Sequence, residues 1–86
     1  MKADHEQITR LLKTARGQID GIIKMVEDDR YCMDISQQVT ATDAVLRRVN
    51  KELLSAHLKH CVENAENDRE RAQRIDELVN ALGKLL

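Results

Sequence analysis

The residues of this 86-residue chain that are most able to do chemistry are Cys32, His57 and Cys61. His57 and Cys61 are four positions apart, which makes them neighbours on one face of a helix and lets both bind one metal ion. Cys32 precedes His57 by 25 residues, or about 37 Å along a straight helix. Cys32 therefore cannot complete such a site within one helix.

An antiparallel pair of these helices, related by a two-fold axis, would bring these three residues together. Cys32 of one chain would then lie opposite residues 57–61 of the other, with the helices crossing near Val45 and Leu46. Each dimer would hold two equivalent sites, each with one cysteine from one chain and the histidine–cysteine pair from its partner.

Two thiolates and one imidazole form a three-coordinate S₂N ligand set. Thiolates select Cu(I), zinc or iron–sulfur centres, and structural zinc prefers four ligands. The set therefore favours Cu(I), unless His60 or a water completes a zinc tetrahedron. The His60 side chain is directed about 100° around the helix from Cys61, so we expect it on the surface, and we expect His5 to be solvated. The alternative is a buried free cysteine beside an unrelated surface histidine.

The composition favours helices, because the chain has no Pro, three Gly and 1% aromatic residues. Apolar residues at intervals of three and four predict helices over residues 4–27, from 32 or 34 to 64, and over 69–82. Asp34 is a candidate N-cap of the second helix, and Gly83 a candidate C-cap of the third.

Gly17 and Gly21 lie on one face of the first predicted helix. Since glycine costs about 1 kcal/mol inside a helix, their presence predicts that a neighbouring backbone comes close. The second predicted helix, of about thirty residues, would be roughly 45 Å long, whereas a compact domain of this size is about 30 Å across. Its apolar stripe would be exposed in a monomer, so we expect one domain over residues 1–86 that forms an obligate oligomer.

Composition and charge exclude several classes of protein. The aliphatic content and a net charge of −1 argue against disorder. No apolar run approaches the roughly 20 residues that a membrane span needs, and residues 1–10 do not resemble a signal peptide. We therefore expect a cytoplasmic protein with free thiols and no membrane partner.

Several stretches of the chain carry a family resemblance: LKTARGQIDGI at residues 12–22, MVE at 25–27, YCMD at 31–34, QVTA at 38–41 and HLxxC at 57–61. They resemble the copper-sensing transcriptional repressors of bacteria, the CsoR family, and the similarity extends over residues 8–82. The resemblance implies an all-α, three-helix subunit. It also implies a dimer with an antiparallel four-helix core, which assembles as a dimer of dimers, a homotetramer.

The resemblance also implies roles for individual residues. Cys32, His57 and Cys61 would bind one Cu(I) per subunit in a trigonal site shared between two chains. The Tyr31 hydroxyl and the Glu77 carboxylate would hydrogen-bond around the ligand histidine, so that copper binding would pull on the third helix. Without the resemblance, Tyr31 is a packed helix-start residue and Glu77 a solvated surface charge.

The net charge of −1 gives no overall attraction to DNA. Basic residues instead form two local clusters, which a tetramer would repeat four times: Arg10, Lys13 and Arg16, and Arg47, Arg48 and Lys51. The resemblance points to Arg48 as a DNA contact, and it places Leu11 where the family commonly has arginine, with Arg10 beside it. The alternative is a solvated face of alternating charge.

We therefore expect a repressor whose apo tetramer binds operator double-stranded DNA and releases it on binding Cu(I), derepressing copper-resistance genes. The first alternative is a persulfide- or thiol-sensing repressor of the same family that uses Cys32 and Cys61. A helical oligomerisation module is a further alternative. An enzyme with a Cys–His nucleophile, or any small-molecule substrate, is disfavoured because no Gly-rich loop or third orienting group is apparent.

Overall fold

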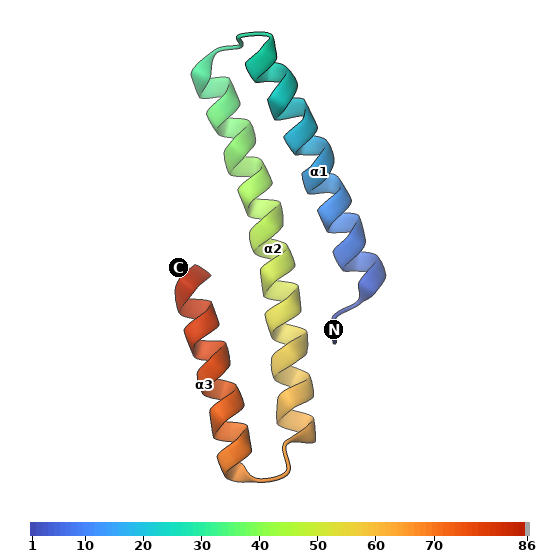
Figure 1. The fold of residues 1–86 in the computed structure, drawn as a ribbon, viewed down its shortest axis with the longest axis vertical. Helices are drawn as coiled ribbons and strands as arrows, with labels where there is room; N and C mark the ends of the chain where they lie inside the picture. Colours follow the sequence, from blue (N-terminus) through green and yellow to red (C-terminus); the bar gives the residue numbers. More distant parts are fainter. Residues whose placement is uncertain (86) are drawn as a thin grey trace. The chain divides into compact units, whose positions relative to one another are not determined.

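The computed structural model describes residues 1–85, which form three α-helices and no strand: α1 (His5–Glu27), α2 (Cys32–Asn64) and α3 (Asp68–Leu85) (Figure 1). The expected all-α, three-helix subunit is confirmed. Contacts divide the chain into two compact units, with α2 continuous through both. The α1 unit comprises residues 4–49, and the α3 unit comprises residues 50–85 together with Met1–Ala3. None of the helices described has the length and apolar character of a membrane span.

Short polar contacts define both ends of α1. The Asp4 carboxylate caps its start by accepting hydrogen bonds from the backbone N–H groups of Glu6 at 3.0 Å and Gln7 at 3.3 Å. At its end, the Asp29 N–H donates to the Val26 carbonyl at 3.1 Å, and the N–H of residue 30 to the carbonyl of residue 25 at 3.0 Å. This pair of bonds is a Schellman motif, with Asp29 at the left-handed position where glycine is usual (φ 54°).

We expect Asp29→Val to lower the free energy of unfolding by about 1–2 kcal/mol, because a β-branched residue fits the left-handed region poorly. Asp29→Gly is the matched control and should be at least as stable as the wild type. Urea unfolding followed by circular dichroism at one protein concentration measures both. A valine variant as stable as the wild type would show that this turn does not constrain the chain.

The α1 unit is held by a small core and one polar contact between its helices. Ile8, Ala15 and Val49 are buried, and so is Thr42. The Thr42 hydroxyl lies 2.9 Å from the Gln18 side-chain oxygen and 3.1 Å from a carbonyl of its own helix. A hydroxyl donates one proton, so it shares that proton between the two acceptors. The contact satisfies a buried polar group and aligns α1 against α2.

Much of the predicted apolar stripe remains exposed in the single chain. An apolar depression on the α1 unit is lined chiefly by five aliphatic side chains, Ile19, Ile22, Ile23, Val39 and Leu46, beside Thr42 and Asp43. Ile23 and Val39 are each 50% exposed, and Leu46 is 41% exposed. Contiguous exposed apolar surface of this kind marks an interaction site.

The single chain leaves open space beside Gly17 and Gly21. A Cβ atom built at either position meets nothing within 4 Å among the described residues. No backbone of the same chain therefore needs the space that glycine leaves. Within the described chain the expected neighbour is absent, and a close approach by the backbone of a second copy stays a prediction.

Two predicted helix caps are corrected, although α2 begins at Cys32, one of the two predicted starts. Asp34 lies inside the first turn of α2, and the Tyr31 carbonyl accepts the first hydrogen bonds of that helix, from Asp34 at 3.0 Å and Ile35 at 3.2 Å. Gly83 lies within α3 and has no positive φ, so it is not a C-cap. Asn67 caps the start of α3, since its side chain accepts from the Glu70 N–H at 2.8 Å.

Candidate metal-binding site and basic surfaces

The histidine–cysteine pair on α2 is spaced to share one metal ion. His57 Nε2 and Cys61 Sγ lie 3.5 Å apart on one face of the helix. Two ligand atoms bound to one ion at about 2.0 Å for nitrogen and 2.3 Å for sulfur would be separated by about 3.5 Å at a tetrahedral angle and about 3.7 Å at a trigonal angle. His57 is exposed and Cys61 is half-buried. The pair therefore fits a thiophilic metal ion without a change in the helix.

An open depression on the α3 unit surrounds this pair. It is lined by Lys2, His57, His60, Cys61, Asn64, Glu70 and Arg74. His60, which we expected on the surface, is half-buried and lines this open depression. Its Nδ1 atom lies 3.2 Å from the Asn64 side-chain nitrogen, which also donates to the His60 carbonyl at 2.8 Å.

Sequence reasoning missed Lys2, Asn64, Glu70 and Arg74 as neighbours of the pair. Asn64 follows His60 by four residues, so helical spacing could have identified it. Lys2 comes from the N-terminal segment, and Glu70 and Arg74 come from α3. No local pattern brings them to α2, so only the folded structure could place them there.

The third predicted ligand, Cys32, begins α2 and is exposed. It belongs to the α1 unit, whereas His57 and Cys61 belong to the α3 unit. Both cysteines are free thiols. Among residues 1–85, no three His, Cys, Asp or Glu side chains are grouped to hold a metal ion. One chain thus presents a two-ligand pair and a separate exposed thiol.

The two predicted partners of the ligand histidine belong to different units of the chain, Tyr31 to the α1 unit and Glu77 to the α3 unit. Tyr31 is 69% exposed at the start of α2. The Glu77 carboxylate lies 3.7 Å from the Arg74 guanidinium, and within residues 1–85 it makes no hydrogen bond with His57. A role for either residue at a metal centre stays a prediction.

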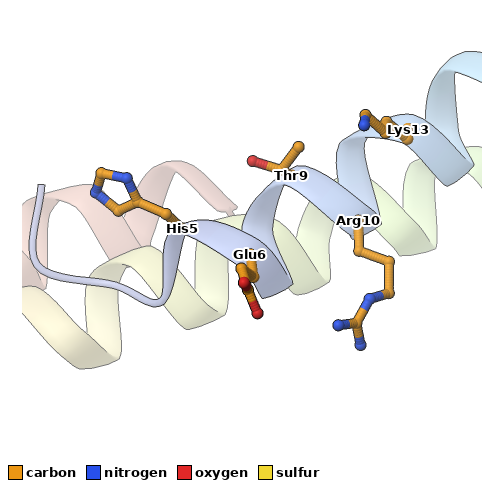
Figure 2. Close-up of a pocket in the computed structure, with 5 residues that line it drawn as sticks. All are labelled: His5, Glu6, Thr9, Arg10 and Lys13. Carbon is orange, nitrogen blue, oxygen red and sulfur yellow. The ribbon is translucent and has the colours of Figure 1, made fainter.

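The basic residues of α1 lie on its exposed surface. Figure 2 shows an open depression at the start of this helix, lined by His5, Glu6, Thr9, Arg10 and Lys13. Arg10, Lys13 and Arg16 are all exposed, whereas Leu11 is half-buried. The start of α1 therefore has a half-buried Leu11 beside an exposed Arg10.

The basic residues of α2 follow one another within about one and a half turns. Arg47, Arg48 and Lys51 are exposed. Arg47 Nε donates to the Asp43 carboxylate at 2.8 Å, an exposed pair four residues apart. Surface pairs of this kind contribute little stability, so Arg47 can exchange its carboxylate for a phosphate at small cost.

Comparison with known proteins now gives the class. Residues 4–84 match the model of the metal-sensitive transcriptional repressor family. This chain belongs to that family, whose members are repressors and not enzymes.

Particular relatives point to a narrower group. The chain is 45% identical over 71 residues to the copper-sensing transcriptional repressor CsoR of Mycobacterium ulcerans, with 83% of this chain and 61% of that protein covered. It therefore spans about three fifths of the length of that relative. It is 42% identical over 81 residues to the CsoR protein of Bacillus subtilis, with 94% of this chain and 80% of that protein covered.

Solved structures share the fold. The copper-sensing repressor CsoR with Cu(I) from Geobacillus thermodenitrificans has a TM-score of 0.80 and 42% identity, with 92% of this chain and 82% of that chain covered. The nickel-responsive transcriptional regulator InrS has a TM-score of 0.81 and 28% identity, with 100% and 97% covered. Since sensors of two metals have the same fold, the ligand residues must decide which metal is sensed.

Proposed function

We propose that this protein is a copper(I)-responsive transcriptional repressor. The observation that carries the proposal is the 3.5 Å separation of His57 Nε2 and Cys61 Sγ on one face of α2. Cys32 of a second copy would complete a trigonal S₂N site, with one Cu(I) per subunit. Two thiolates and one imidazole suit the soft Cu(I) ion, and two relatives covering most of this chain are named for copper sensing.

The second copy is supported by the exposed apolar depression on the α1 unit. Pairing of this surface about a two-fold axis perpendicular to α2 would cover its aliphatic side chains and place the two copies in an antiparallel arrangement. A dimer of such dimers would repeat the basic clusters of α1 and α2 four times. Those clusters would provide the contacts to phosphate that a net charge of −1 does not provide.

The proposed mechanism is a linkage between two binding events in the cytoplasm. The apo tetramer binds operator double-stranded DNA through its arginine and lysine clusters. The ligand residues bind Cu(I) more tightly in a tetramer state with lower DNA affinity, so copper releases the operator and derepresses copper-resistance genes. By reciprocity, DNA weakens Cu(I) binding by the same factor. Turning a mostly bound operator into a mostly free one requires about 5 kcal/mol of coupling.

Fluorescence anisotropy of operator DNA with reduced protein tests the proposal, with and without Cu(I) under anaerobic conditions at a stated salt concentration. We expect the apo protein to bind and Cu(I) to release it. His57→Ala should still bind Cu(I) through its thiolates. It should not release DNA, because the imidazole through which the ion would pull on Glu77 and the third helix is missing. A wild-type protein that binds no DNA in either state would overturn the proposal.

A second candidate function is sensing of persulfides or related sulfur electrophiles. It is favoured by one observation, that Cys32 and Cys61 are free and Cys32 is exposed. The same anisotropy assay separates the two functions when a persulfide donor replaces Cu(I). Release by the donor but not by Cu(I) would assign the protein to sulfur sensing.

We expect Arg48→Ala to weaken operator binding by at least about tenfold and to lower the salt dependence of binding, since each lost phosphate contact reduces the slope by about one. Arg69→Ala is the matched control, because Arg69 is exposed in the acidic first turn of α3 and should change binding little. Anisotropy titrations at several salt concentrations measure both variants. Equal effects from the two substitutions would contradict the assignment of Arg48.

A further inference from the structure

The first three residues belong to the α3 unit. Met1–Ala3 group with the C-terminal part of the chain, and Lys2 lines the depression that contains His57 and Cys61. Among the described residues that line the candidate metal site, Lys2 is the one that comes from the N-terminal segment. No sequence pattern connects it with the ligand pair, which lies more than fifty residues further along the chain.

We propose that Lys2 is a specificity-determining residue that supplies the counter-charge for the metal centre. The inference rests on the proposed function, because it concerns the charge of a Cu(I) site. Two thiolates, a neutral imidazole and one Cu(I) sum to a net charge of −1. Bringing that charge to a partly buried place is unfavourable unless a cation lies nearby.

The charges around the depression identify Lys2 as that cation. Arg74 lies 3.8 Å from the Glu70 carboxylate and 3.7 Å from the Glu77 carboxylate, so its charge is already shared between two acids. His60 contacts Asn64. The Lys2 ammonium makes no ion pair among residues 1–85, and its charge is available to the centre. An anionic S₂N centre gains from this lysine, whereas a divalent ion on the same three ligands would be neutral and would gain less.

Cu(I) affinities of the reduced full-length protein test this inference, measured by competition with a chromophoric Cu(I) chelator at about 0.1 M of a non-coordinating salt. Lys2→Glu should weaken Cu(I) binding about tenfold and Lys2→Gln about threefold. Lys59→Glu is the control, because it makes the same charge change at an exposed position of α2 outside the depression. It should change the affinity less than twofold. Near 1 M salt the effect of Lys2→Glu should shrink, because Lys2 is exposed and the Debye length falls to about 3 Å.

The outcomes separate this inference from the function on which it rests. If the wild type binds Cu(I) and releases DNA but Lys2→Glu matches Lys59→Glu, the role of Lys2 is wrong and the proposed function stands. A loss in Lys2→Glu that is undiminished at 1 M salt also overturns the counter-charge, because salt would reduce an electrostatic effect at an exposed lysine and would not reduce a structural one. If the wild type binds no Cu(I), both proposals fail. Circular dichroism of each variant checks that the helices are intact.

Discussion

Replacing Cys61 by serine should remove tight Cu(I) binding, with a loss of affinity of at least about a thousandfold, because a hydroxyl is a poor ligand for a soft ion. Cys32→Ser should cause a similar loss, although Cys32 belongs to a different unit of the chain. Chelator competition under anaerobic conditions measures both. A protein that keeps its affinity after either substitution would contradict the S₂N ligand set.

Mixing the two inactive variants tests whether the site is shared between chains. In a dimer of one Cys32→Ser chain and one Cys61→Ser chain, one site has all three native ligands and the other lacks both cysteines. Refolding the two together at equal amounts should therefore restore about a quarter of a site per chain, since half of the dimers are mixed. A site formed within one chain would give no recovery, and this outcome would exclude the intersubunit arrangement.

Replacing Leu46 by glutamate should prevent assembly of the protein. Leu46 is 41% exposed and lines the apolar depression of the α1 unit. Covering a leucine contributes about 1.5–3 kcal/mol, and two-fold symmetry applies the loss twice per dimer. Covering an unpaired carboxylate adds a further penalty. We expect a monomer by light scattering, together with a lower melting temperature and no operator binding.

Ala44→Glu is the matched control for Leu46→Glu. Ala44 is an exposed α2 residue that does not line the depression, so the same carboxylate there should leave assembly intact. A monomeric wild type would contradict the proposed pairing directly. An oligomeric Leu46→Glu variant would show that the copies pair through a different surface.

Much of the fold could be predicted from the sequence because helices follow local rules. Apolar spacing predicted three helices, and α1 ends at the predicted Glu27. The errors lie where the conformation of the backbone or contacts between distant segments decide how a helix begins or ends. Asp29 takes the left-handed position that a glycine would ordinarily mark, so composition could not reveal how α1 ends. Gly83 was predicted to be the C-cap of the third helix, but it lies inside α3.

The candidate site divides in the same way. The spacing of His57 and Cys61 was sufficient to predict their contact, because four residues along a helix return to the same face. No local sequence pattern could predict which residues surround this pair. Lys2 and Glu70 reach the depression from other segments of the chain, and Arg74 holds the Glu77 carboxylate that we expected near the histidine.

The sequence by itself determined the helices, the pairing of His57 with Cys61 and the separation of Cys32 from that pair. Each of these depends only on the number of residues per turn and the rise per residue within one helix. Only the tertiary structure decided which charges surround the pair and which apolar faces stay uncovered. Those features depend on the packing of α1 and α3 against different parts of α2. Contacts between distant segments set the packing, and no periodicity within one segment encodes it.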